Sequence, residues 1–434
     1  MRKIAEEIFI AGVESVLPEK LIKSQIKLSE ENIQIGEMLF PLSIYKNIYV
    51  LAAGKAGALM AKEIENVLGD KISGGHVITK YGHATDLKQL TITEARHPIP
   101  DAEGVKGTQK ILDIVRNAGE NDLVICLISG GASALMSDLP ESSSLDDLII
   151  TNEVLVRCGA NITEINSVRK HLSNLKGGQL AQAIYPATTV SLILSDVIGD
   201  RMDVIASGPT VGDTSTFADA LKVIEKYSLE KSLPNSILSY IQKGLTGLIA
   251  ETPKPYNRIF RYVHNYIIGS NRIALKNALQ KACELGFETH IITDSLQGDF
   301  TEAADFIMKT IENNPPMGNK SVCLLFGGEP TVKVSGNGLG GRNQHLALYL
   351  SNKIDKRENI TILCAGTDGT DGPTDVAGAV IDHETMAIAS IKKSNPHIFL
   401  QNSDSYQFFR QIGGHIITGN TGTNVMDIIV VLIK

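Results

Sequence analysis

Tryptophan is absent from this sequence, and aromatic residues make up only 5% of it. Glycine, by contrast, occurs 39 times in 434 residues. Few aromatic side chains provide few large stacking surfaces, whereas glycine-rich loops let the backbone approach a ligand closely. The composition is therefore more typical of a nucleotide-dependent enzyme than of an aromatic peptide-binding groove.

Long runs of one residue class are also absent. The 48 acidic and 41 basic residues give a net charge of −7, and no basic run is long enough to follow a nucleic-acid backbone. No apolar run approaches the roughly 18 residues of a membrane-spanning helix. Charged residues interrupt positions 1–17, which predicts an amphipathic helix rather than a signal peptide. We expect a cytoplasmic protein that binds small molecules, with neither nucleic acid nor a membrane as partner.

The cysteines give no sign of cross-links. There are five of them, an odd number, and no C-x-x-C pair occurs. Three lie in Val, Ile and Leu runs, where a free thiol packs as a small apolar side chain. The sequence predicts neither a disulfide framework nor a structural zinc site.

The chain is long enough for two hydrophobic cores, since a single core stops growing at about 250–300 residues. Apolar runs that end in glycine or serine loops are typical of buried parallel strands, and they occur at 47–53, 122–128 and 189–194. Strands of a second sheet are expected at 266–268, 288–293, 321–326, 361–365 and 425–433. We predict an α/β fold with two α/β domains separated by a cleft: a Rossmann-like amino-terminal domain with a parallel sheet (1–250) and a carboxy-terminal domain (251–434).

Gly54, Lys55, Ala56 and Gly57 directly follow the first strand. Glycines let backbone amides approach an anion there, and the lysine adds a positive charge. A tight turn with a solvated lysine is the less favoured alternative, because ligands bind at the carboxyl ends of such strands. The sequence contains no G-x-x-x-x-G-K-[ST] loop, so an ordinary P-loop is excluded.

A second loop, with Ser129, Gly130, Gly131 and Ser133, follows the next strand and opens a predicted helix. Its amides and hydroxyls can bind an anion, or its serines can cap the helix, and the spacing leaves both open. Asp196 follows the third strand, where a carboxylate can accept a hydroxyl proton or hold a cation. A surface turn rich in Asp and Gly is the alternative.

Residues 336–341 match G-x-G-x-x-G but lack the acidic residue that a dinucleotide site needs about 20 residues later. We instead single out Arg342, which follows Gly340 and Gly341 and precedes Asn343, as a two-point donor to a carboxylate or phosphate. A helix is expected to begin near Arg342. A surface arginine is the alternative.

The loop 364–375 contains three aspartates and does not satisfy the EF-hand pattern. Asp368, joined by Glu329, is therefore a candidate for Mg²⁺, which is commonly held by one or two carboxylates and by substrate phosphates. An Asp- and Gly-rich surface turn is equally consistent with the spacing.

Nine ordered motifs together resemble the glycerate 2-kinase family that carries a carboxy-terminal MOFRL domain. They lie at 53–56, 129–133, 166–172, 176–178, 194–197, 206–210, 327–330, 341–344 and 365–373. The resemblance implies that ATP, with Mg²⁺, phosphorylates the C2 hydroxyl of D-glycerate, giving 2-phospho-D-glycerate and ADP. It also implies that Lys55 and Arg342 are the essential cations, with Asp196, Glu329 and Asp368 as supporting acidic residues.

Phosphoryl transfer requires positioning and charge neutralisation. We predict that Lys55 and Arg342 approach each other across the cleft, that Asp196 orients the C2 hydroxyl, and that the loop amides at 129–133 bind ATP or substrate. An NAD(P)H-dependent hydroxypyruvate reductase and a non-catalytic small-molecule-binding protein are the alternatives. The oligomeric state stays open, and a homodimer is one of the allowed states.

Overall fold

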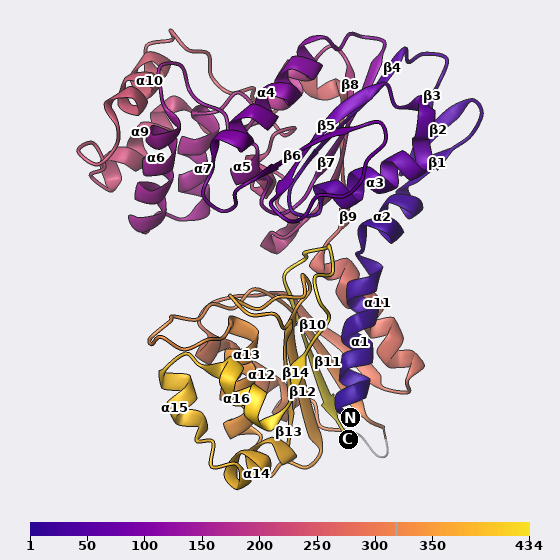
Figure 1. The fold of residues 1–434 in the computed structure, drawn as a ribbon, viewed down its shortest axis with the longest axis vertical. Helices are drawn as coiled ribbons and strands as arrows, with labels where there is room; N and C mark the ends of the chain where they lie inside the picture. The colour runs from indigo at the N-terminus through magenta and orange to yellow at the C-terminus, as the bar shows by residue number, and fades with distance from the viewer. Residues whose placement is uncertain (317–319) are drawn as a thin grey trace. The chain divides into compact units, whose positions relative to one another are not determined.

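The computed structural model describes residues 1–316 and 320–434, which form two compact units (Figure 1). The central unit comprises Leu21–Ser195 and Asp200–Ile268. The terminal unit comprises Met1–Lys20, Asp196–Gly199 and Gly269–Lys434, and it contains both chain ends. Within the described ranges, no helix combines the length and the apolar character needed to cross a bilayer.

A six-stranded sheet in the order β6-β5-β4-β7-β8-β9 is the framework of the central unit. Its strands are β4 (Asn47–Ala53), β5 (Gly74–Lys80), β6 (Thr91–Ala95), β7 (Asp122–Ile128), β8 (Thr188–Leu194) and β9 (Val263–Gly269). The pairs from β6 to β8 are all parallel. Every residue of β7 is buried, as in parallel sheets covered by helices. Ala53 and Ile193 are both level with Ile128, so the loops after β4, β7 and β8 leave from one edge.

Helices surround this sheet and extend beyond it. They are α2 (Pro18–Gln25), α3 (Gly57–Leu68), α4 (Ala102–Arg116), α5 (Ala132–Leu135), α6 (Leu145–Arg157), α7 (Ile162–His171), α8 (Gln179–Ile184), α9 (Phe217–Lys226) and α10 (Asn235–Leu245). Four of them, α6, α7, α9 and α10, gather beside the sheet around a core of their own (Figure 1). Capping boxes fix where α6, α7 and α9 begin. A small antiparallel sheet precedes β4 and consists of β1 (Ile26–Leu28), β2 (Asn32–Ile35) and β3 (Met38–Pro41).

The terminal unit contains a mixed sheet in the order β10-β11-β15-β12-β13-β14. Its strands are β10 (Glu288–Leu296), β11 (Val322–Gly328), β12 (Ile360–Gly366), β13 (Gly378–Asp382), β14 (His415–Ile416) and β15 (Asp427–Ile433). Only β10 and β11 pair in parallel, and β15 runs antiparallel to both β11 and β12. Asp427, the first residue of β15, is therefore level with Gly328 and Gly366, the last residues of β11 and β12.

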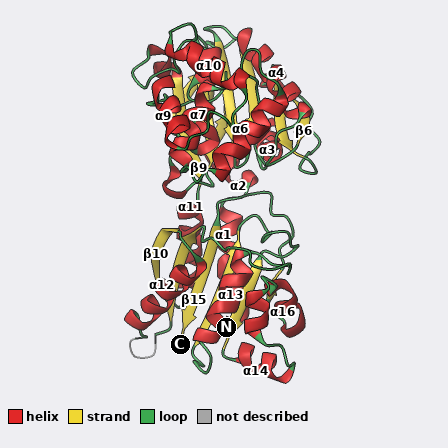
Figure 2. Ribbon diagram, turned by 90° about the vertical axis from the view of Figure 1, so that its left-hand side faces the viewer, coloured by secondary structure: helices red, strands yellow, loops and turns green. Residues whose placement is uncertain are grey.

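Helices cover both faces of this mixed sheet (Figures 1 and 2). One face is covered by α1 (Arg2–Ser15) and α11 (Asn271–Glu284). The other carries α12 (Phe300–Asn313), α13 (Arg342–Lys353), α14 (Glu384–Ile391), α15 (Pro396–Gln401) and α16 (Ser405–Ile412). The predicted mixed α/β architecture with a parallel amino-terminal sheet is thus confirmed.

One expected strand lies in a different sheet. The assignment of 266–268 to the second sheet is wrong, because β9 is the edge strand beside β8 in the central unit. The Asn265 side-chain amide on β9 donates to the Thr210 carbonyl at 3.1 Å and helps to hold it there. The domain boundary after residue 250 stays a prediction. The compact units group 251–268 with the central unit, and they group 1–20 with the terminal unit because α1 packs on α11, β12 and β15.

Candidate active site

The loops after β4 and β7 are joined by backbone and side-chain hydrogen bonds. The Lys55 amide donates to the Gly130 carbonyl at 2.9 Å, and the Ala56 amide donates to Ser129 Oγ at 3.1 Å. The Ser129 amide in turn donates to the Ala53 carbonyl at 3.0 Å. These contacts fix the backbone of Lys55 at the carboxyl edge of the central sheet, where ligands bind in open α/β sheets.

The ammonium group of Lys55 has no carboxylate partner within residues 1–316 and 320–434. The side chain is half-buried, and two histidines lie close to it. His83 bonds through Nδ1 to the Lys55 carbonyl at 3.1 Å. Burial, together with the positive charges of Lys55 and Lys80, lowers the pKa of His97 to about 4. At neutral pH, therefore, the neighbouring His97 is uncharged and the positive charge of Lys55 is not neutralised.

The serines of the second loop are engaged within the protein. Ser129 accepts from Ala56 rather than capping α5, and Ser133 Oγ lies 2.9 Å from Ser207 Oγ. The structure thus shows no helix cap by a side chain at α5, which is only four residues long. Anion binding by the amides at 129–133 stays a prediction.

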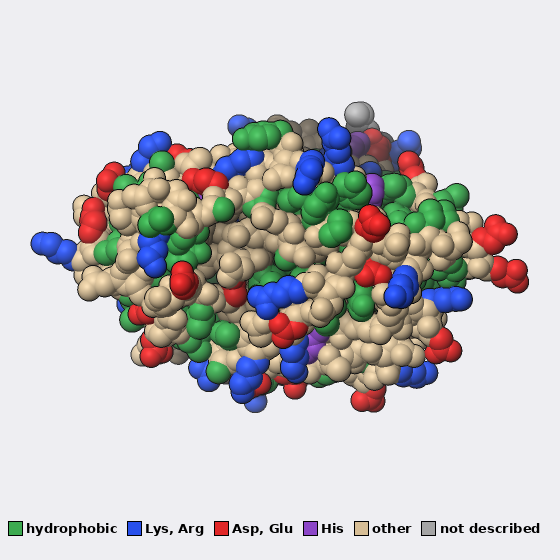
Figure 3. All heavy atoms as spheres, turned by 90° about the horizontal axis from the view of Figure 1, so that it is seen from above, with side chains coloured by type: hydrophobic (Ala, Val, Ile, Leu, Met, Phe, Trp, Pro, Cys, Tyr) green, Lys and Arg blue, Asp and Glu red, His purple; other side chains and the backbone are tan. Residues whose placement is uncertain are grey.

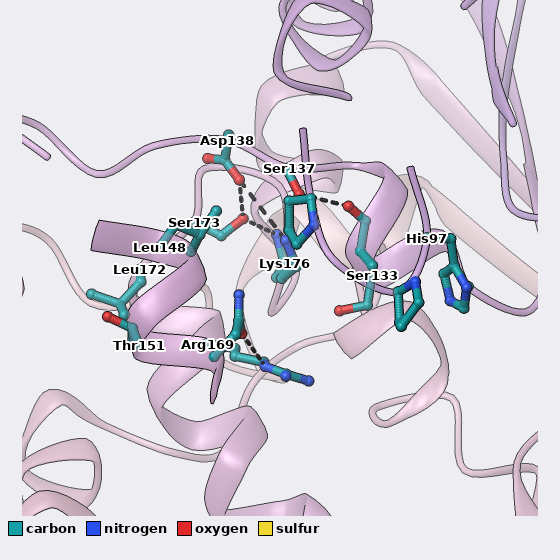
Figure 4. Close-up of a pocket in the computed structure, with 15 residues that line it drawn as sticks. His97, Ser133, Ser137, Asp138, Leu148, Thr151, Arg169, Leu172, Ser173 and Lys176 are labelled. Atoms are coloured by element: carbon teal, nitrogen blue, oxygen red, sulfur yellow. Dashed lines mark hydrogen bonds and ion pairs between the residues drawn. The ribbon is translucent and has the colours of Figure 1, made fainter. Parts of the chain in front are cut away.

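A pocket of about 230 Å³ lies in the central unit beside this loop (Figure 4). Its charged and polar lining includes His97, Asp138, Arg169, Ser173 and Lys176. The sequence patterns do not single out these side chains, although the family motifs at 166–172 and 176–178 contain two of them, Arg169 and Lys176. Those two motifs are the signal in the sequence that points to this pocket.

Arg342 begins α13 in the terminal unit, where the sequence predicts it. Its Nε and Nη2 atoms donate to the two carboxylate oxygens of Asp427 at 2.6 and 2.9 Å, and Nη1 lies 2.7 Å from Glu329 Oε1. Burial alone lowers the pKa of Arg342, but the charges of Asp427 and Glu329 outweigh it and the pKa is raised. Arg342 is therefore a permanently charged group held at the strand-end edge of the mixed sheet.

Asp371 holds the first turn of α13. Its carboxylate accepts the backbone amides of Asn343 and Gln344 at 3.0 and 2.8 Å, and the side-chain amides of both residues at 3.3 and 3.0 Å. Burial raises the pKa of Asp371 to about 6 in spite of these bonds. The predicted ligand-binding residue Asn343 is thus buried and turned towards Asp371, and its binding role stays a prediction.

Glycines make room for that packing. A Cβ atom on Gly341 would lie 2.3 Å from the Asp371 backbone, and one on Gly340 would lie 2.3 Å from Ser405 Oγ. The G-x-G-x-x-G match therefore reflects close packing within the terminal unit, in agreement with the rejection of a dinucleotide site.

The candidate metal ligands lie at the same edge as Arg342. Asp368 Oδ1 accepts the Thr370 amide at 3.1 Å, and Asp368 and Asp427 both approach Gly366. Within the described part of the chain, no three His, Cys, Asp or Glu side chains form a metal-binding group. Such an arrangement fits Mg²⁺ only with substrate phosphates as further ligands. Asp196 groups with the terminal unit, and its role stays a prediction. Lys55 belongs to the central unit and Arg342 to the terminal unit, so their expected approach also stays a prediction.

Comparison with known proteins identifies relatives of this chain. Residues 4–242 match a family described as a domain of unknown function (DUF4147), and residues 322–427 match the MOFRL family. A D-glycerate 2-kinase from Thermotoga maritima is 40% identical over 437 aligned positions, covering 100% of this chain and 98% of the relative. The chain belongs to the glycerate 2-kinase family.

Further members of the glycerate 2-kinase family agree with this result. The crystal structure of glycerate kinase from T. maritima matches with a TM-score of 0.87, covering 100% of this chain and 99% of that chain at 40% identity. A glycerate 2-kinase from Pyrococcus horikoshii is 39% identical and covers 100% of this chain and 97% of the relative. A relative from Agrobacterium vitis, 37% identical over 88% of this chain and 86% of its own length, bears the provisional name hydroxypyruvate reductase. The family predicted from the nine motifs is confirmed.

Proposed function

We propose that this protein transfers the γ-phosphoryl group of ATP to the C2 hydroxyl of D-glycerate. A bond forms between the C2 oxygen and the γ-phosphorus, the bond from that phosphorus to the β–γ bridging oxygen breaks, and the hydroxyl proton passes to a base. The products are 2-phospho-D-glycerate and ADP. The observation that carries the proposal is the full-length identity of 40% to a D-glycerate 2-kinase.

Lys55 is proposed to neutralise the transferring phosphoryl group. Its charge has no carboxylate partner among the described residues, and its backbone is fixed by the Gly130 carbonyl. A preorganised cation of this kind stabilises charge that develops in the transition state without first having to break an ion pair.

Arg342 is proposed as the second cation. Because Asp427 occupies its Nε–Nη2 edge, the side of Nη1 is the part that we assign to a reactant oxygen. Glu329, which pairs with Nη1, has a side chain that is 44% exposed. A reactant phosphate or carboxylate can therefore replace Glu329 at Nη1, while Asp427 keeps the guanidinium in place.

Asp368 and Glu329 are the residues that would hold Mg²⁺, together with phosphate oxygens of ATP. Such an ion screens negative charge on the phosphates and orients them. Asp196 is the residue that we assign to orienting the C2 hydroxyl. The main-chain amides of Gly54 and Ser129 already donate to the carbonyls of Ile78 and Ala53. Those of Gly130, Gly131 and Ser133 are the ones that we assign to a phosphate or to the substrate carboxylate.

The direct test is ADP formation with D-glycerate, ATP and MgCl₂, followed by phosphorus NMR of the product. We expect D-glycerate-dependent ADP release and a phosphate on carbon 2. A phosphate on carbon 3 contradicts the assignment of the hydroxyl, and no ADP release above the rate without glycerate contradicts the kinase.

The hydroxypyruvate reductase name of one relative is tested in the same preparation. NADH and hydroxypyruvate replace ATP and glycerate, and the absorbance of NADH is followed. We expect no loss of absorbance above the rate without protein, because the glycines of 336–341 pack against Asp371 and residues 402–405 within the terminal unit instead of opening a dinucleotide site. Rapid oxidation of NADH contradicts the proposal in favour of the reductase.

A further inference from the structure

The pocket beside the 129–133 loop has no role in the proposed function as it stands. Four separate segments line it: His97 to Pro100, Gly131 to Asp138, one side of α6, and α7 with the turn that follows it. All of these segments belong to the central unit. Figure 4 shows Arg169 and Lys176 among the side chains that line it, with Asp138 and Ser173 next to Lys176.

Arg169 brings a positive charge to this pocket that no acidic side chain balances. Its Nε donates to Asn152 Oδ1 at 2.7 Å, and within residues 1–316 and 320–434 it forms no ion pair. Burial lowers the pKa of Arg169, yet a guanidinium stays charged at any physiological pH. The rest of its planar donor edge is free to bind an oxygen pair in a two-point manner.

Lys176 adds a second, more deeply buried charge. Its Nζ donates to the Met136 carbonyl at 2.9 Å and lies 4.0 Å from Asp138 Oδ1. Asp138 is already bound by the Ser173 hydroxyl at 2.6 Å and by the side-chain amide of Asn174 at 3.1 Å. Two cations and one carboxylate, which other donors share, therefore line the pocket, and a buried charge without compensation is costly.

The remaining polar wall adds no negative charge. His97 is neutral at pH 7, since burial lowers its pKa to about 4. Ser133 and Ser137 contribute hydroxyls. With Lys176 protonated, the groups that line this pocket sum to one positive charge. Burial lowers the pKa of Lys176 although Asp138 opposes that effect, and an anionic ligand would stabilise the protonated form.

The pocket also adjoins Lys55. A Cβ atom on Gly131, which lines the pocket, would lie 3.0 Å from the His97 ring and 3.5 Å from Lys55 Cγ. A ligand in the pocket is therefore separated from the Lys55 side chain by little more than the Gly131 backbone and the His97 ring.

We propose that this pocket binds an anionic oxygen group of a reactant, a carboxylate or a phosphate, with Arg169 as its principal donor. The role of Arg169 in turnover rests on the proposed kinase function. Two reactants carry this chemistry: D-glycerate through its carboxylate and ATP through a phosphate. Neither Arg169 nor Lys176 was assigned a role above, so the pocket extends the set of binding residues around Lys55.

The test replaces Arg169 by Gln and by Lys and measures KM for ATP and for D-glycerate separately. R169Q removes the charge, and we expect the KM of one reactant to rise about 10-fold or more, the loss of one charge-assisted contact. R169K keeps a point charge without the planar edge, and we expect a smaller rise in the KM of that same reactant. A rise for D-glycerate identifies the carboxylate as the ligand, and a rise for ATP identifies a phosphate.

Arg116→Gln is the matched control. Arg116 is an exposed arginine at the end of α4, 3.2 Å from Asp113, and it lines neither this pocket nor the adjoining one that Arg169 also lines. We expect both KM values of R116Q to stay within twofold of wild type. Should folded R169Q keep both KM values within twofold of wild type, the pocket proposal is overturned.

A binding measurement separates the pocket from the kinase. Calorimetric titrations of wild type, R169Q and R169K with inorganic phosphate, D-glycerate and ADP, each alone, require no turnover. Binding that weakens about 10-fold in R169Q supports the pocket even if no glycerate kinase activity is found, an outcome that contradicts the proposed function only. If R169Q does not fold, R169K decides: unchanged affinity for all three ligands overturns the pocket.

Discussion

Arg342 and Asp427 form a two-point ion pair at the strand-end edge of the terminal unit, with contacts of 2.6 and 2.9 Å. The Asp427 side chain is 1% exposed, and its pKa is raised by burial although Arg342 opposes that effect. Because β15 lies between β11 and β12, this carboxylate reaches Arg342 from the middle of the sheet. Asp427 thereby fixes the edge of the guanidinium that does not face Glu329.

The first prediction concerns that pairing. Asp427→Asn leaves a single acceptor oxygen opposite Nε and Nη2, so the guanidinium is no longer held at two points. We expect kcat to fall about 100-fold with KM changed less, because small displacements of a catalytic group have effects of that size. Steady-state kinetics, with thermal unfolding to confirm folding, measure this split.

Asp305→Asn is its control. Asp305 pairs with Lys353 at 2.9 Å on the surface of the same unit, and its side chain is 69% exposed. Exposed pairs of this kind contribute little, so we expect wild-type kinetics. A D427N enzyme as active as D305N contradicts a positioning role for Asp427.

The second prediction concerns Lys55. Lys55→Met preserves the aliphatic stem and removes a charge that has no ion-pair partner in the described chain. We therefore expect unchanged thermal stability and a kcat lower by about 100- to 1000-fold, the usual effect of deleting a charge that stabilises the transition state. Lys62→Met, an exposed position on α3, is the matched control and should retain full activity. Near wild-type turnover by K55M contradicts the role of this cation.

The third prediction concerns pH and Asp371. The pKa of this carboxyl is raised to about 6 in the folded protein, whereas an ordinary Asp titrates near 3.8. The folded state then binds the proton more tightly, so the contribution to stability is present below pH 4 and is lost as pH rises through about 6. We expect the unfolding free energy of wild type, relative to Asp371→Asn, to fall between pH 4 and pH 6.5 and to level off above.

Urea unfolding across that range measures the difference. Asp375→Asn, an exposed position on the same loop that accepts the Tyr406 hydroxyl at 2.9 Å, is the control and should leave the pH profile unchanged. If the unfolding free energy of wild type minus that of D371N increases with pH, the prediction that folding raises the pKa of Asp371 is contradicted.

Much of this fold is readable from local pattern. The run 47–53 and the run 122–128 match β4 and β7 at both ends, and Arg342 begins α13 as predicted. Local signals suffice there because buried parallel strands are continuously apolar and end abruptly at glycine or serine loops. The same pattern misplaced β9, because a strand's sequence does not specify which sheet edge accepts it.

The acidic and basic side chains are scattered over the face drawn in Figure 3, which agrees with the absence of a long basic run in the sequence.

The site was harder to predict than the strands. Asp427 lies 85 residues from Arg342, and only the antiparallel placement of β15 between β11 and β12 brings them together. Arg169 lies on α7, whose apolar spacing indicates nothing beyond a packed helix. The Arg342–Asp427 pair and the pocket around Arg169 each bring together segments that are distant in sequence. Composition and spacing do not encode such contacts.

The fourth prediction uses two glycines with nearly the same backbone. Gly131 has φ +85° and Gly159 has φ +82°, so alanine at either position adopts a left-handed conformation that costs about 1–2 kcal/mol. Their surroundings differ, since a Cβ on Gly159 meets nothing within 4 Å whereas one on Gly131 meets the His97 ring at 3.0 Å and Lys55 Cγ at 3.5 Å. We expect similar losses of stability for Gly131→Ala and Gly159→Ala, but a loss of activity for Gly131→Ala only.

Chemical denaturation and initial rates on the two variants give both quantities. If the two variants lose the same stability, the backbone strain that they share does not explain a difference in activity. That difference is then due to the displaced side chains, which only G131A causes. Since His97 and Lys55 are the displaced groups, a selective fall in the activity of G131A links the pocket wall to the reacting centre through their contact. Equal activities in G131A and G159A would instead show that the position of Lys55 tolerates a methyl group at its side.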